Sequence, residues 1–188
     1  MLFRSAAVRD VIKAVAEGVL AVALVVNPAL ATNNFKFDLP QVVTQTVEQR
    51  AAVPKSAQAA MSDAAQVTYS AVAPIAKAAN KAFMITDKAD GKLHVFHADG
   101  TPIIQTAALT GRDTGDQLQG GKGITPAGQY SIRFTPDAEY AGGFRYDLVE
   151  TSRGGGIIAV HAVYTGEASE KRPQRLTTPS AADNRISW

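Results

Sequence analysis

The stretch AFMITDKADGKLHVFHADGTPIIQTAAL, from Ala82 to Leu109, decides the fold. Its runs AFMITD and KLHVFH are rich in the apolar and aromatic residues that favour strands, and the turn sequence KADG separates them. The pair Asp99-Gly100 is a hairpin signal, and the strand-like run PIIQTAAL follows it. The stretch therefore predicts consecutive antiparallel strands that are connected by short turns.

Further strand candidates follow along the chain, QYSIRF, FRYDLVE and GIIAVHAV, and no helical pattern interrupts residues 82–165. Several short strands at close spacing predict a mainly β fold, an antiparallel-rich β-sandwich or barrel. Within KLHVFH the side chains alternate between two faces, with Leu93, Val95 and His97 on one and His94 and Phe96 on the other.

Residues 1–31 resemble an export signal. A basic start precedes the apolar run AVAEGVLAVALVV, and Ala29-Leu30-Ala31 has the small-x-small form of a cleavage site. The uninterrupted apolar part, Gly18–Val26, is much shorter than the ~20 residues of a membrane span, so we expect no stable span after cleavage. The predicted location is the periplasm or the cell wall. The alternative is an amphipathic cytoplasmic helix, because Asp10 and Glu17 weaken the signal.

Residues 32–81 are rich in Ala, Gln, Val, Ser and Thr, with three prolines and no glycine. Such a composition favours short helices and disorder, and its apolar stripe is weak. We predict a helical or disordered N-terminal extension that acts as a tether, with the folded domain occupying residues 82–188.

Bulk composition excludes several classes of function. The 188 residues carry a net charge of +2 without a basic cluster, which gives nucleic-acid binding no support. Cys is absent, so these residues contain neither a disulfide nor a thiolate metal site. No cofactor motif is present, and none is expected.

The glycine-rich loop TGRDTGDQLQGGKGITPAG matches neither the phosphate-binding pattern around Lys122 nor the dinucleotide pattern. What remains is KGITPAGQY, in which Pro126 fixes one backbone angle and Gly128 permits a positive φ. We predict a rigid turn that leads into a strand.

The chain has three histidines. His94 and His97 point to opposite faces of one strand and cannot readily share a metal, so we predict surface residues and no metal site. His161 ends the apolar run GIIAVH, which would bring it to the edge of a buried strand. An imidazole there suits a general base, although a satisfied, partly buried histidine is the alternative on residue type alone. No Gly-x-Ser-x-Gly elbow supplies a nucleophile.

Four segments together resemble the L,D-transpeptidase catalytic domain over residues 82–188. ITDKADGKLHVFHADGTPIIQTAALTG is similar to its opening hairpins and KGITPAGQYSI to its Thr-Pro-x-Gly segment. GIIAVHAV is similar to the strand of its catalytic histidine, and NRISW to the start of its Ser/Thr-x-Gly-Cys signature. In that pattern the nucleophilic Cys is expected two residues beyond Trp188.

The resemblance implies an exported acyltransferase that cross-links peptidoglycan peptide stems and releases D-Ala. His161 carries over as the base and Ser187 as the hydroxyl that orients the histidine or the reacting carbonyl. Thr125, Pro126 and Gly128 carry over as substrate-binding residues that shape the wall of the site. The present residues lack the nucleophile, so we expect this chain by itself to be inactive.

Two other interpretations stay open. The absent Cys, and Ala162 where the family has Gly, allow a non-catalytic envelope domain of the same fold that binds wall peptides. An unrelated secreted β-domain is the third. The basic segment Lys171–Arg175 is either a lid that meets wall carboxylates or, as favoured by its charge, a solvated loop.

Overall fold

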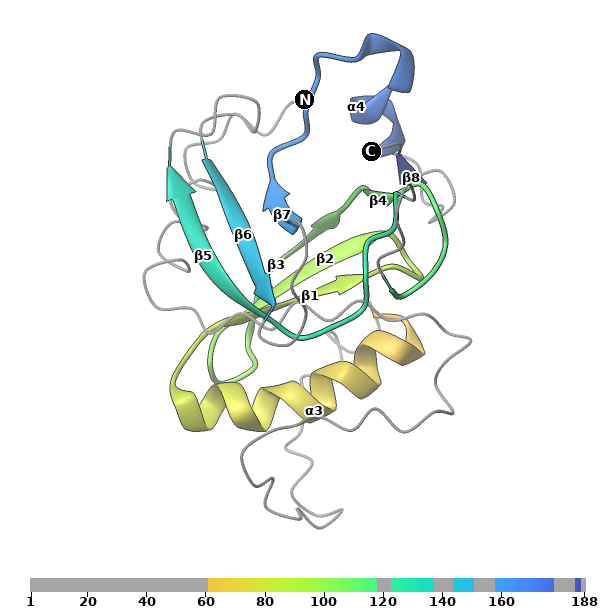
Figure 1. The fold of residues 1–188 in the computed structure, drawn as a ribbon. Helices are drawn as coiled ribbons and strands as arrows, with labels where there is room; N and C mark the ends of the chain where they lie inside the picture. Colours follow the sequence, from red (N-terminus) through yellow and green to blue (C-terminus); the bar gives the residue numbers. More distant parts are fainter. Residues whose placement is uncertain (1–60, 118–122, 137–143, 151–157, 178–184, 187–188) are drawn as a thin grey trace.

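The computed structural model describes residues 61–117, 123–136, 144–150, 158–177 and 185–186. In these ranges the chain forms mostly strands and few helices, which confirms the mainly β prediction (Figure 1). The elements are α3 (Asp63–Ala79), β1 (Phe83–Asp87), β2 (Lys92–Phe96), β3 (Pro102–Ala107), β4 (Thr110–Gly111), β5 (Tyr130–Pro136), β6 (Phe144–Glu150), β7 (Ile158–His161), the 3-10 turn η4 (Ala168–Glu170), α4 (Arg172–Arg175) and β8 (Arg185–Ile186).

The strands form three sheets with the orders β1-β2-β3, β5-β6-β7 and β4-β8. The first two, here called the first and second sheet, are antiparallel throughout, while β4 and β8 pair in parallel. Turns with Gly91 at φ 61° and Gly100 at φ 86° connect the strands of the first sheet. Glycine adopts these angles without the clash that a Cβ would cause. The hairpins predicted for residues 82–109 are therefore present.

Helix α3 covers one face of the first sheet (Figure 1). Its buried residues join those of β1 and β2 in one apolar cluster: Met61, Ala65, Tyr69, Val72, Ala76, Phe83, Ile85 and Phe96. The ring centroids of Tyr69 and Phe96 lie 4.9 Å apart in an edge-to-face arrangement that favours aromatic pairs. The hydroxyl of Tyr69 donates to the carbonyl of Gly100 at 2.9 Å, which ties the helix to the second hairpin.

The packed unit therefore begins earlier than the sequence indicated. The tether was predicted to run to residue 81, but residues 61–79 contribute half or more of this apolar cluster. The physical reason is composition: several of the buried residues of α3 are alanines, which give little sign of an apolar stripe in the sequence. The predicted domain start at Ala82 falls inside the packed unit.

Side chains in β2 alternate between the two faces as predicted, but His94 lies in a buried environment. His94 shares the face of Phe96, which α3 covers, and it is only 3% exposed. The prediction that His94 lies on the surface is wrong for this reason. His97, just beyond the strand, is exposed.

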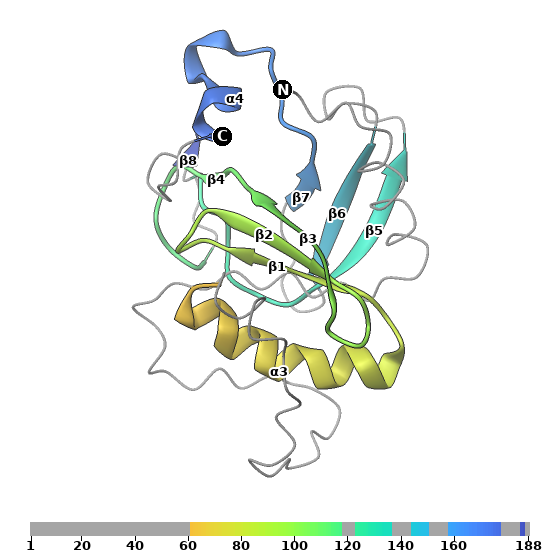
Figure 2. The same cartoon turned by 180° about the vertical axis from the view of Figure 1, so that it is seen from behind.

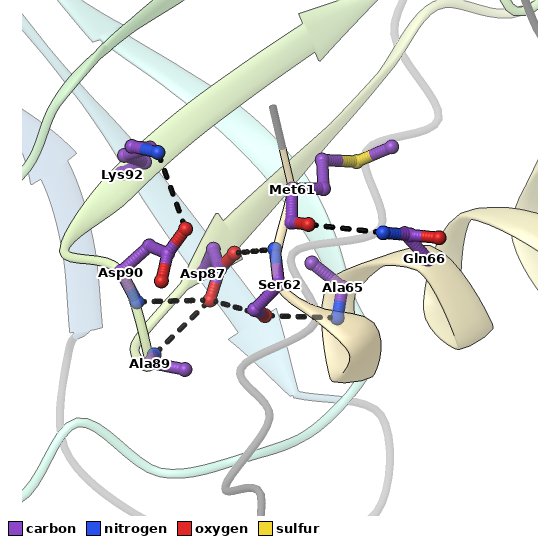
Figure 3. A network of polar contacts seen from close by, with 8 residues as sticks. All are labelled: Met61, Ser62, Ala65, Gln66, Asp87, Ala89, Asp90 and Lys92. Atoms are coloured by element: carbon purple, nitrogen blue, oxygen red, sulfur yellow. Dashed lines mark hydrogen bonds and ion pairs between the residues drawn. The ribbon is translucent and has the colours of Figure 1, made fainter. Parts of the chain in front are cut away.

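Asp87, at the end of β1, connects the sheet to the start of α3 (Figure 3). Asp87 is 1% exposed, and its carboxylate accepts hydrogen bonds from the backbone N–H and the hydroxyl of Ser62, both at 2.9 Å. It also accepts from the N–H groups of Ala89 and Asp90 at 3.0 and 3.2 Å. The hydroxyl of Ser62 in turn accepts from the N–H of Ala65, as an N-cap does. One carboxylate thus organises the β1–β2 turn and the helix start together.

The second sheet packs on the face of the first sheet that is opposite α3 (Figures 1 and 2). Met84 and Val95 of the first sheet contact Ile132 of β5 and Val160 of β7. The same face of the second sheet buries Tyr130 and Leu148. The helix and the two sheets thus form successive layers with apolar side chains between them.

The predicted signal peptide and most of the predicted tether lie outside the described residues. Within the part of the chain that the structure describes, no helix is both long and apolar enough to cross a membrane.

Candidate functional site

His161 is the last residue of β7, at the point where the chain leaves the second sheet. Its side chain is partly buried, and Nδ1 lies 2.7 Å from the carbonyl oxygen of Ala162. A carbonyl can only accept, so Nδ1 carries the hydrogen in the neutral ring and Nε2 is the basic nitrogen. The backbone next to His161 therefore sets the tautomer that a general base requires.

The neighbours of His161 come from its register in the second sheet. Arg145 of β6 lies directly opposite His161, and Asp147 lies opposite Ala159. Because opposite residues of an antiparallel pair share a face, Arg145, Asp147 and His161 all project from the face that is not packed on the first sheet. Tyr146, between them, points to the other side and is buried, and this burial raises its pKa to about 12.

Asp147 is the centre of a polar group on this face, here called the Asp147 cluster: Arg133, Thr135, Arg145 and Asp147. Its carboxylate accepts from Nε of Arg145 at 2.6 Å, from the hydroxyl of Thr135 at 2.7 Å and from Arg133 at 3.3 Å. Burial alone would raise the pKa of Asp147, but these three donors outweigh it and hold the pKa below its usual value. The cluster therefore contains a firmly ionised carboxylate between two guanidinium groups.

The sequence did not single out this cluster. The signal was present in QYSIRF and FRYDLVE, where polar and apolar residues alternate and Arg133, Arg145 and Asp147 occupy polar positions. Pairing the two runs as a hairpin puts the three charges on one face. Their closeness to His161 depends on the register of β7, which the runs alone do not define.

Thr125 lies in the segment before β5 and contacts Gly111 and Lys88. Its hydroxyl accepts from the N–H of Gly111 at 2.7 Å, and its carbonyl accepts from Nζ of Lys88 at 2.8 Å. A Cβ added to Gly111 would meet the carbonyl oxygen of Gly123 at 2.2 Å, so only glycine permits this approach. Thr125 therefore holds β4, the strand that pairs with β8.

Lys88 fixes the same loop from the other side. Its ammonium group donates to the carbonyls of Gly115 and Thr125 and forms an ion pair with Asp116. Burial lowers the pKa of Lys88, and the carboxylate of Asp116 opposes that shift. The lysine therefore has a structural part in shaping the Thr125 segment.

Pro126 and Gly128 form the predicted turn before a strand, since β5 begins at Tyr130. The hydroxyl of Tyr130 donates to the carbonyl of Pro126 at 3.3 Å. Gly128 differs from the prediction, because its φ is not positive. A Cβ at this position would lie 3.0 Å from the hydroxyl oxygen of Tyr130 and 3.1–3.3 Å from its ring, so a larger residue requires the tyrosine to shift slightly. These two residues, like Thr125, have backbone and packing roles in the structure.

The basic segment Lys171–Arg175 is solvated only in part: Lys171, Pro173 and Gln174 are exposed, while the two arginines of α4 have protein contacts. Arg172 is 3% exposed, pairs with Glu170 and lies over the ring of Tyr164 at 5.3 Å from the centroid. Arg175 donates from Nε to the carbonyl of Glu170 at 2.7 Å and from Nη1 to the carbonyl of Arg185 at 3.1 Å.

The contact of Arg175 connects α4 to β8, the strand that precedes Ser187. Ser187 itself lies outside the described residues, as does the position expected for the Cys. The structure therefore describes only the two residues before the expected signature, a short strand that pairs with β4 and accepts a hydrogen bond from Arg175.

In the ranges that the structure describes, no group of three or more His, Asp or Glu side chains is arranged to hold a metal ion. Comparison of the chain with family models, with curated proteins and with solved structures finds no match in any of the three.

Proposed function

We propose that this chain belongs to an exported L,D-transpeptidase-type acyltransferase that acts on peptidoglycan peptide stems. In this proposal the two sheets correspond to the β-sandwich of that enzyme type. The nucleophile is a cysteine encoded two residues beyond Trp188, and Ser187 is the signature hydroxyl. The protein works in the periplasm or cell wall, after export by residues 1–31, and needs no cofactor.

The geometry of His161 is the observation that carries the proposal. It ends a strand, and its Nδ1 donates to a backbone carbonyl, which leaves Nε2 as the proton acceptor. A cysteine needs such a base nearby to become a thiolate at neutral pH. The four ordered segments that resemble the family supply the identity of the nucleophile and of the substrate.

The proposed reaction has two stages. The thiolate attacks the carbonyl of the third stem residue, and the bond to the terminal D-Ala breaks. The D-Ala nitrogen takes the proton that the imidazole of His161 had received from the thiol. The thioester then passes to the side-chain amine of a neighbouring stem, and His161 takes the proton of that amine.

The test begins with the coding sequence that follows Trp188. A protein that includes its in-frame continuation is incubated with tetrapeptide stems, and D-Ala release and acylation of the cysteine are measured. We expect His161→Gln to reduce turnover at least ~100-fold, as loss of a general base does. His97→Gln, an exposed histidine outside the second sheet, is the matched control and should retain activity.

Absence of an in-frame Gly-Cys, or of D-Ala release by a folded protein that has it, overturns the enzyme proposal. A stop codon together with measurable binding of stem peptides supports the second candidate, a non-catalytic envelope domain. The residue after His161 favours that candidate, since Ala162 stands where the family has glycine.

A further inference from the structure

We propose that Arg145 binds the terminal carboxylate of the donor peptide, beside His161. This inference rests on the proposed function and identifies which group of the stem peptide the second sheet recognises. It makes Arg145 a specificity-determining residue that favours stems with a free terminal carboxylate over amidated ones.

Position is the first part of the argument. Arg145 and His161 are directly opposite in the β6–β7 pair. Side chains at such positions share a face, and their Cβ atoms lie about 4.5–5.5 Å apart. The guanidinium group and the imidazole therefore start from adjacent points on the polar face of the second sheet.

Orientation is the second part. Nε of Arg145 donates to the buried carboxylate of Asp147 at 2.6 Å, and that carboxylate is itself held by Thr135 at 2.7 Å. The side chain of Arg145 is 19% exposed, so it is largely fixed and still accessible at the surface. A guanidinium that is oriented beforehand loses less conformational freedom when it binds a ligand.

Charge is the third part. Arg145 brings a positively charged guanidinium group to the position opposite His161, and its Nε holds the carboxylate of Asp147. Such a group attracts anions, and the planar guanidinium fork matches the geometry of a carboxylate. The described face of the second sheet thus offers a carboxylate a partner next to the proposed base.

The chemistry of the donor peptide agrees with this placement. In its terminal residue a single carbon separates the nitrogen that leaves from the carboxylate. A ligand whose nitrogen is close to His161 must therefore have its carboxylate within a few ångströms of it. Recognition by Arg145 would align the nitrogen with the imidazole that protonates it.

The test measures binding by the present chain, which contains no cysteine and so cannot turn the ligand over. The probe is an N-acetylated tetrapeptide that ends in D-alanine, and its C-terminal amide is the matched ligand. We expect the acid to bind at least tenfold more tightly than the amide. In Arg145→Gln the two affinities should become equal within twofold.

Arg133→Gln is the matched control. Arg133 contacts the same carboxylate, but its side chain is 68% exposed and its register partner is Asp147. This variant should retain most of the preference for the acid. Equal affinities in the unmodified chain, an unchanged preference in Arg145→Gln, or an equal loss in both variants overturns the inference.

A second measurement requires no variant. The imidazole signals of His161 are followed by NMR in the unmodified chain during titration with each peptide. A shift with the acid and none with the amide supports the inference, and equal shifts overturn it, even if Arg145→Gln does not fold.

The outcomes are distinct from those that test the enzyme proposal. Preference for the acid without later D-Ala release leaves carboxylate binding in place and removes the transferase. D-Ala release with an Arg145→Gln variant that still prefers the acid removes only the role of Arg145.

Discussion

Replacing Asp87 by alanine should destabilise the protein more than any other single change near the start of α3. The carboxylate accepts four hydrogen bonds, two from Ser62 and one each from the N–H groups of Ala89 and Asp90 (Figure 3). A hydrogen bond to a charged group contributes about 1.5–3 kcal/mol net, so four would sum to roughly 6–12 kcal/mol. The donors are only part-buried and water can reach them in the variant. We therefore expect a loss of about 3–5 kcal/mol in the free energy of unfolding.

The assay is chemical unfolding followed by far-UV circular dichroism, with amide hydrogen exchange to locate the effect. Exchange should accelerate in α3 and in the β1–β2 turn, because Asp87 connects the two. Ser62→Ala removes one of the four bonds together with the helix cap and should cost about 1–2 kcal/mol.

Asp90→Ala is the matched control. Its carboxylate lies in the same turn, but it is 39% exposed and pairs only across the surface with Lys92. Exposed ion pairs contribute about 0–1 kcal/mol, so this variant should remain close to the unmodified protein. If Asp87→Ala costs no more than Asp90→Ala, the reasoning that one buried carboxylate fastens α3 to the sheet is refuted.

Three further predictions concern other parts of the fold. Burial lowers the pKa of His94, so the unfolded chain binds a proton at this histidine more readily than the folded chain. The free energy of unfolding should therefore fall as the pH drops below about 6.5 towards the folded-state pKa. This dependence should disappear in His94→Leu but persist in a variant of the exposed His97. A chain that starts at Ala82 lacks the helical half of the apolar cluster and should not fold cooperatively, whereas one that starts at residue 61 should show a sigmoidal thermal transition. Arg175→Ala should accelerate amide exchange in β8 without lowering the melting temperature by more than a few degrees, and unchanged exchange there would contradict the bracing role of its contact with Arg185.

The sequence was informative where local chemistry alone determines structure. Turn residues and alternation defined the strands of the first sheet, because each hairpin closes over a few residues. Helix α3 was underestimated, because its packing depends on alanines whose burial becomes visible only with the sheet in place. The buried position of His94 was missed for the same reason, since the helix covers its face.

The site divides in a similar way. His161 was selected because an apolar run ends in an imidazole, a local pattern that the structure reproduces at the end of β7. Arg145 and Asp147 were not selected, since their relation to His161 arises from the pairing of strands that are separated along the chain. Non-local register is the information that a single sequence does not display.

A contribution to the stability of the fold does not by itself explain why the Asp147 cluster is present. Apolar replacements of buried ion pairs are often neutral or stabilising, so a buried carboxylate with two arginines is weak evidence of a stabilising device. The opposite face of the same strands shows the alternative that the fold uses for cohesion, with Tyr130, Leu148 and Val160 in apolar contact. Three donors nevertheless converge on Asp147, and one of them belongs to the residue opposite His161. An arrangement that contributes little to cohesion, yet fixes a cation beside His161, agrees with the proposal that Arg145 binds a carboxylate there.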